Sequence, residues 1–177
     1  MTAESTMTTS HSIHNDLNLV KESVYDKCGF VISNLKQSIE SVEYGACSYE
    51  VNGKKIQHRT SKITPTKCGQ FVTIWKRNNQ GITEPYGISD QLDFIVITSK
   101  SGDNIGLFIF PIAILSENGI ISSNGKEGKR GIRVYPPWDN PTNKQAKKTQ
   151  DWQTKFFVSI KAQDPTVLDL TRKLFGI

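Results

Sequence analysis

The stretch LDFIVITSKSGDNIGLFIF, residues 92–110, decides the fold. Two apolar segments, 92–99 and 105–110, flank the sequence SGD at 101–103, which is typical of a tight turn. Both segments are apolar at consecutive positions rather than at alternate ones, so both faces of each strand are expected to be buried. The stretch therefore predicts a β-hairpin in the middle of a sheet.

Shorter strand signals lie on both sides of this hairpin. Residues 46–62 predict an earlier hairpin, because Asn52 and Gly53 both tolerate the positive φ that a two-residue turn needs. Residues 70–77 alternate between two faces, and residues 132–135 form another short strand signal. The middle of the chain therefore predicts a sheet built from hairpins.

Helical signals lie towards the two ends of the chain. Apolar side chains recur at near-helical spacing in residues 16–40, which predicts a helix interrupted near Cys28 and Gly29. Residues 143–161 predict another helix, and Asp164 is expected to cap a last one. The whole pattern predicts an α+β fold, a central antiparallel β-sheet of hairpins flanked by N-terminal and C-terminal helices.

A chain of 177 residues fits one domain. We expect residues 13–177 to form it and residues 1–12, rich in Ser and Thr, to be a frayed tail rather than a secretory signal. No apolar run approaches the ~20 residues of a membrane helix. The three cysteines are odd in number and widely spaced, which predicts free thiols and a cytoplasmic location.

The charges are segregated along the chain. Residues 51–77 hold seven Lys and Arg side chains and no Asp or Glu, and residues 119–161 hold nine basic and three acidic side chains. Residues 1–50 and 78–118 each carry a net charge of −4. Two interpretations follow: the basic blocks form one positive face, or they neutralise the acidic segments across the fold.

A positive face of this composition suits phosphate groups. Lys and Arg supply charged donors, Ser and Thr supply hydroxyl donors, and aromatic rings can stack on the bases of a single strand. For Trp75 and Arg77 the alternative is a core ring beside an edge charge. The predicted anion-binding residues are Arg59, Lys62, Lys67, Trp75, Arg77, Lys126, Lys129, Arg130, Arg133, Tyr135 and Trp138.

The second basic block contains a glycine-rich loop. Gly125, Gly128 and Gly131 would allow backbone N–H groups to converge on an anion, and four cations lie within residues 125–133. The spacing is not that of a P-loop. The alternative is a flexible, solvated loop.

Enzymatic chemistry has only a loose pattern in this sequence. Asp93 with Glu127 and Lys129 follows the order of a metal-dependent nuclease, an acid before an acid-x-Lys pair, as weak candidates for catalytic residues. Cys47, His58 and Cys68 lack the close pairing of zinc ligands. No metal and no cofactor is therefore predicted.

Short strings between about Tyr44 and Phe157 are specific when taken together. They are YGAC at 44–47, KITPTK at 62–67, GQFVTIWKR at 69–77, DF at 93–94, FP at 110–111, GKRG at 128–131, RVYPPW at 133–138 and KQA at 144–146. In this combination the chain resembles the MepB family. The resemblance implies a small bacterial cytosolic protein and carries over no catalytic residue. Because most of the strings lie in the two basic blocks, the resemblance favours a shared site there.

The leading hypothesis is a non-membrane binding protein that recognises nucleic acid or another phosphate-bearing ligand through the two basic blocks. One alternative is a metal-dependent nuclease or other enzyme that uses Asp93 and Glu127. Another is a pocket for an acidic small molecule, paired with Lys62 and Arg133. The sequence leaves open the ligand, the oligomeric state and whether the basic blocks share one face.

Overall fold

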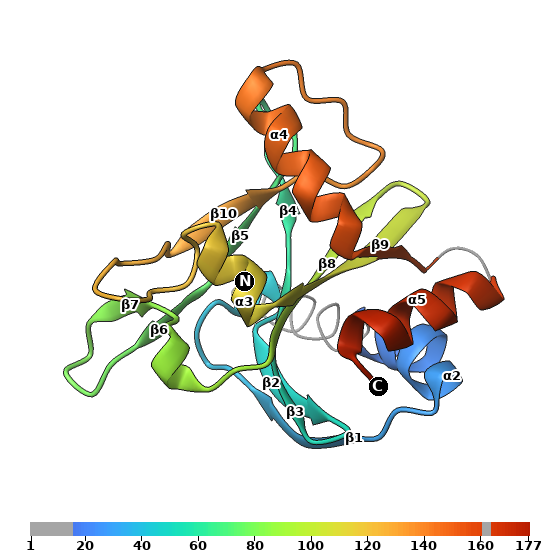
Figure 1. The fold of residues 1–177 in the computed structure, drawn as a ribbon, viewed down its shortest axis with the longest axis horizontal. Coiled ribbons are helices and arrows are strands. Elements are labelled where there is room, and N and C mark those ends of the chain that lie inside the picture. The colour runs from blue at the N-terminus through green and yellow to red at the C-terminus, as the bar shows by residue number, and fades with distance from the viewer. Residues whose placement is uncertain (1–15, 161–163) are drawn as a thin grey trace, which may run out of the picture.

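A six-stranded β-sheet forms the centre of the computed structural model, which describes residues 16–160 and 164–177 (Figure 1). The predicted tail, residues 1–12, lies outside the described residues. The predicted α+β class is confirmed. In spatial order the strands are β1 (Ile32–Gln37), β2 (Cys47–Val51), β3 (Lys54–Thr60), β8 (Phe94–Ser101), β9 (Asn104–Pro111) and β11 (Phe157–Ser159).

The hairpin of β8 and β9 occupies the interior of this sheet, as predicted. Its antiparallel register runs from Phe94 opposite Pro111 to Ser101 opposite Asn104. Side chains alternate between two hydrophobic clusters, so that Val96 belongs to one and Ile95 to the other. Residues 94–97 of β8 and 107–110 of β9 are apolar at every position because both faces of these strands are covered.

One pair of central strands is parallel, which corrects the prediction of an entirely antiparallel sheet. β3 runs parallel to β8, with Ile56 opposite Phe94 and Thr60 opposite Thr98. Parallel neighbours need a long crossover connection. Here residues 61–93 provide it, and they form most of the two smaller sheets instead of a crossover helix.

The N-terminal segment is helical only in its first half. Residues 16–20 are α-helical, and the helix continues as a π-helical turn (Lys21–Tyr25) and α2 (Asp26–Cys28). Gly29 then ends it in the left-handed conformation, with φ of 76°. The helix predicted beyond this glycine is wrong, because strand β1 follows.

The spacing that suggested a second helical segment comes from exposed residues of an edge strand. Val31 is 67% exposed and Leu35 is 47% exposed. The register of β1 on β2 shifts between Ser33 and Lys36, which marks a β-bulge. Apolar residues on an irregular edge strand imitate helical spacing without burying a helical face.

The C-terminal helix α5 (Pro165–Phe175) covers one face of the central sheet together with the N-terminal helix (Figure 1). Asp164 caps it as predicted, since its side chain accepts a hydrogen bond from the N–H of Thr166. Phe175 is fully buried against Tyr25, Phe30 and Phe94. No helix among the described residues is both long enough and apolar enough to span a membrane.

The opposite face carries a three-stranded sheet and α4 (Lys144–Gln153). Its strands are β4 (Lys62–Ile63), β5 (Gln70–Thr73) and β10 (Gly131–Val134). The helix predicted for residues 143–161 is too long, because after a 3₁₀ turn the chain forms strand β11, which pairs with β9. Strands β6 (Trp75–Arg77) and β7 (Thr83–Pro85) form a two-stranded sheet. The short helix α3 (Ile112–Glu117) follows β9.

A buried chain of polar side chains crosses the core beneath α5. His58 Nδ1 lies 2.7 Å from the hydroxyl of Tyr49, and His58 Nε2 lies 2.8 Å from Oγ1 of Thr98. The hydroxyl of Tyr49 in turn lies 2.7 Å from that of Tyr25. Burial, and then the neighbouring guanidinium of Arg59, lower the pKa of His58 from 6.5 to about 3, so the imidazole is neutral.

Stability is expected to fall as the pH is lowered from about 6.5 towards about 3. The unfolded chain binds a proton at His58 across this window and the folded protein does not, so the free energy of unfolding drops by up to about 1.4 kcal/mol per pH unit. Urea unfolding at several pH values measures the slope. A His58→Gln protein should show a shallower slope, and an unchanged slope would assign the effect to other groups.

Candidate functional site

The three-stranded sheet brings the two basic blocks together. β5 lies in the middle, antiparallel to β4 from the first half of the chain and to β10 from the second. Arg133 stands opposite Phe71, and Phe71 stands opposite Lys62. Segments about 60 residues apart in sequence therefore share one small sheet.

Arg133 fastens this junction with its own side chain. It donates hydrogen bonds to the backbone oxygens of Cys68 and Gly69, at 3.2 and 3.4 Å, and to Oγ1 of Thr64 at 2.6 Å. Gly69 has φ of 80°, and a Cβ atom there would lie 2.7 Å from the ring of Tyr135. The turn before β5 thus needs glycine at this position.

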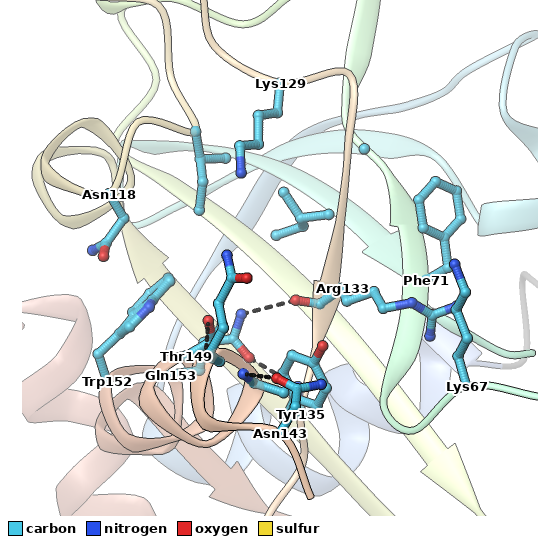
Figure 2. A pocket seen from close by; sticks show the side chains of 15 residues that line it. Lys67, Phe71, Asn118, Lys129, Arg133, Tyr135, Asn143, Thr149, Trp152 and Gln153 are labelled. Carbon is cyan, nitrogen blue, oxygen red and sulfur yellow. Dashed lines mark hydrogen bonds between the residues drawn. The ribbon is translucent and has the colours of Figure 1, made fainter. Parts of the chain in front are cut away.

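A groove of about 590 Å³ opens between β10 and α4 (Figure 2). Three cations line it: Lys67 from the first basic block, and Lys129 and Arg133 from the second. No Asp or Glu is among the lining residues. Lys67 and Lys129 are exposed at the rim, and Arg133 is half-buried.

Two glutamines fasten α4 to the strand that carries Arg133. Gln153, which is 1% exposed, donates to the backbone oxygen of Arg133 at 3.0 Å and accepts from the N–H of Tyr135 at 2.8 Å. Gln150 donates to the backbone oxygens of Pro136 and Asp139, at 3.0 and 2.8 Å. These bonds supply the partners that the end of β10 needs, and they set the width of the groove.

Aromatic rings form part of the floor of the groove. Phe71, Tyr135 and Trp152 line it and are half-buried. Trp152 also packs on Phe110 of β9, with ring centroids 5.4 Å apart. Trp138 does not line this groove: it packs on Phe157 at 5.6 Å.

The sequence did not single out Trp152, Gln150 or Gln153 as site residues. In the helix predicted for residues 143–161, Thr149 and either Trp152 or Gln153 fall at inward positions, which are typical of the core. The one available signal was a glutamine at an inward position, since a buried amide needs hydrogen-bond partners.

Two of the predicted anion-binding cations form ion pairs with carboxylates of the protein itself. Arg77 pairs with Glu40, and its Cζ lies 5.5 Å from the ring centroid of Trp75. Arg130 pairs with Glu127 at 2.9 Å. Arg77 is therefore neutralised by a residue of the first acidic segment and Arg130 by a residue of its own block, and a single positive face stays a prediction.

The remaining predicted cations lie outside the groove. Lys62 lies over the ring of Tyr44, 4.7 Å from its centroid. Lys126 lines a different cavity, together with Glu127. Arg59 is buried in a third cavity, which also contains Trp75 and Arg77.

The glycine-rich loop does not present converging N–H groups to an anion. The N–H of Lys126 donates to the oxygen of Ser123, that of Gly128 to Oγ of Ser122, and that of Lys129 to the oxygen of Ile120. A Cβ atom at Gly128 would lie 2.3 Å from the oxygen of Ile120. The loop is therefore held against its neighbours, and it contributes the side chain of Lys129 rather than backbone donors.

The weak nuclease candidates lie apart in the fold. Asp93 accepts a hydrogen bond from the N–H of Lys55 at 2.8 Å, at the start of β8. Glu127 and Lys129 line different cavities, and Asp93 lines neither. Within residues 16–160 and 164–177, no group of three or more His, Cys, Asp or Glu side chains could hold a metal ion.

Comparisons with known proteins agree on one family. A family model described as MepB-like matches residues 38–159, which include every residue of the groove. A crystal structure of MepB is similar to this fold, with a TM-score of 0.71 and 33% identity, covering 75% of this chain and 89% of that chain. No curated protein matches. The sequence match and the shared fold together show that the chain belongs to the MepB-like family.

Proposed function

We propose that the protein binds single-stranded nucleic acid in the groove between β10 and α4. The observation that carries the proposal is the lining of this groove, which draws cations from both basic blocks and contains no carboxylate. Phosphate oxygens are bound by such charged donors.

The three cations of the groove keep their charge available. Among the described residues, none of Lys67, Lys129 and Arg133 forms an ion pair. Arg133 donates only to neutral oxygens. The outer surface of α4 adds Lys144, Lys147 and Lys148, all exposed. A polyanion therefore gains attraction without displacing a carboxylate.

The rings favour a single strand over a duplex. Three half-buried rings, Phe71, Tyr135 and Trp152, line the same groove as the cations. Unpaired bases stack on such rings, and each stack contributes about 1–3 kcal/mol in single-strand binding proteins. Paired bases are already stacked on one another and do not use these surfaces.

A phosphate-bearing small molecule is the second candidate. The groove volume of about 590 Å³ falls within the range of about 300–1,000 Å³ that is usual for small-ligand sites. The exposed position of Lys67 and Lys129 at the rim favours the polymer, because a backbone can follow cations that an enclosed nucleotide would not reach.

Fluorescence anisotropy with labelled, mixed-sequence DNA and RNA single strands tests the proposal. Binding is expected at low salt, and log K should fall with log salt with a slope of about −2 for three phosphate contacts. Competition by duplex and by mononucleotides separates the candidates: full competition by a mononucleotide favours the small molecule. Absence of binding at low salt would refute the polymer proposal.

A further inference from the structure

Arg59 is a buried cation in the middle of the central sheet. It lies on β3 and is only 3% exposed. Its neighbour His58 points to the opposite face, where it joins the Tyr49 and Thr98 network. A guanidinium does not lose its proton in proteins, so Arg59 carries a full positive charge inside the fold.

Within the described part of the chain, only neutral groups accept hydrogen bonds from Arg59. Nη1 donates to Oε1 of Gln57 at 3.2 Å and to the backbone oxygen of His58 at 2.9 Å, and Nη2 donates to the hydroxyl of Tyr86 at 3.2 Å. Nε has no hydrogen-bond partner among residues 16–160 and 164–177, and one N–H group of Nη2 is also unused there. Among the described residues no carboxylate pairs with this side chain.

The nearby thiol does not balance this charge. Burial raises the pKa of Cys47 to about 12, even though Arg59 acts in the opposite direction, so the thiol is neutral. The ring of Tyr86, whose centroid lies 6.0 Å from Cζ, adds a weak cation–π contact. Burying an ion without a counter-charge costs several kcal/mol, and these neutral contacts offset only part of that cost.

Arg59 lines a cavity of about 250 Å³ that is rich in positive charge. Lys36, Lys76 and Arg77 are the other cations of its lining, and Glu40 is the one carboxylate. Glu40 is already paired with Arg77, and Lys76 is paired with Glu84 and Asp90, which leaves Lys36 as the other cation of the lining without a described carboxylate partner. Trp75 and Tyr86 supply aromatic wall. The cavity therefore contains a desolvated cation, Arg59, and a second cation, Lys36, neither of which is paired with a carboxylate among the described residues.

We propose that this cavity binds a small oxyanion, a carboxylate or a phosphate, through Arg59. One oxygen of the ligand matches the unused N–H group of Nη2, and a second oxygen on the same carbon or phosphorus matches Nε–H once the side chains that now close Nε off from solvent move aside. The volume limits the ligand to a small molecule or to the anionic end of a larger one. None of the lining residues belongs to the groove between β10 and α4, so this site is independent of the proposed nucleic-acid site.

Thermal unfolding of the full chain tests the site with inorganic phosphate and acetate as probes. Sodium chloride at matched ionic strength is the reference. The melting temperature is expected to rise with phosphate or acetate and not with chloride. If only phosphate or only acetate raises the melting temperature, that result identifies the ligand class. If neither probe raises it more than chloride does, the proposal is overturned.

Two substitutions at Arg59 connect the response to this side chain. Arg59→Met should remove the rise in melting temperature that the anion causes. Arg59→Lys keeps the positive charge but lacks the planar N–H donors of the guanidinium, so it should weaken anion binding about tenfold or more. Arg172→Met is the matched control, because Arg172 lies on α5 beside Asp169, and it should respond like the wild type. An anion response that persists in folded Arg59→Met protein would overturn the proposal.

A third variant serves if the substitutions at Arg59 prevent folding. Ser48→Leu places an apolar side chain in the lining while leaving Arg59 intact, and it should abolish the response. A response equal to that of the wild type would contradict the site. Anion binding should also persist when Lys67, Lys129 and Arg133 are replaced, so failure of this site and failure of the nucleic-acid proposal are distinguishable.

Discussion

Simultaneous replacement of Lys67, Lys129 and Arg133 by glutamine is expected to weaken binding of a single-stranded oligonucleotide about 100-fold at low salt. Each substitution removes a charge-assisted hydrogen bond to phosphate, which contributes at least about 1 kcal/mol. The slope of log K against log salt should also become shallower by about 2, because three phosphate contacts are lost. Anisotropy titrations over a salt series measure both quantities.

The matched control removes the same charge from another part of the surface. Lys27, Lys54 and Lys173 are exposed or half-exposed and lie outside the groove, so their joint replacement by glutamine gives the same net charge. This control should bind nearly as tightly as the wild type. Equal losses in the two variants would show that binding depends on net charge and not on the groove.

The central hairpin could be predicted because its signal is local. Residues 92–110 are apolar on both faces of two consecutive strands, and burial on both sides follows directly from that pattern. The parallel pairing of β3 with β8 could not be predicted in the same way. Nothing in either strand distinguishes a parallel neighbour from an antiparallel one, since the choice depends on the path of residues 61–93.

The errors at the two ends of the chain have different physical causes. At the N-terminal end, Gly29 stops the helix, and the following strand repeats apolar residues at a spacing that a helix would also show. At the C-terminal end, Phe157 and Val158 continue an apolar helical pattern but pair with β9 instead. In both places, strand pairing with residues distant in sequence overrides the local pattern.

The basic blocks could be found from the sequence. Which of their cations line the groove and which pair with carboxylates could not. Lys67 and Arg133 meet because β5 lies between β4 and β10, which is a matter of topology. Arg77 and Arg130 are paired with Glu40 and Glu127, so similar residues of the same blocks have different surroundings. Charge counts record the sign of a segment, and only the fold decides which charges reach solvent.

The conversion of Gln153 to methionine is expected to destabilise the protein by about 1–3 kcal/mol. Methionine has nearly the same size but cannot bond to the backbone oxygen of Arg133 or the N–H of Tyr135, so two part-buried main-chain groups lose their partner. Chemical unfolding measures this loss. Gln145→Met is the control, because Gln145 is exposed on the same helix and lines the same groove.

The same substitution separates the position of α4 from the charge of the groove. Folded Gln153→Met protein retains every cation, so its salt slope should equal that of the wild type, while its affinity for the oligonucleotide falls about tenfold as α4 loses its anchor to β10. The triple glutamine variant should instead lose both affinity and slope. If the position of α4 matters, folded Gln153→Met protein should bind the oligonucleotide less tightly than the wild type. Equal affinity would show that binding does not depend on the width of the groove, and that the cations of β10 and of the turn at residues 64–69 act without the helix.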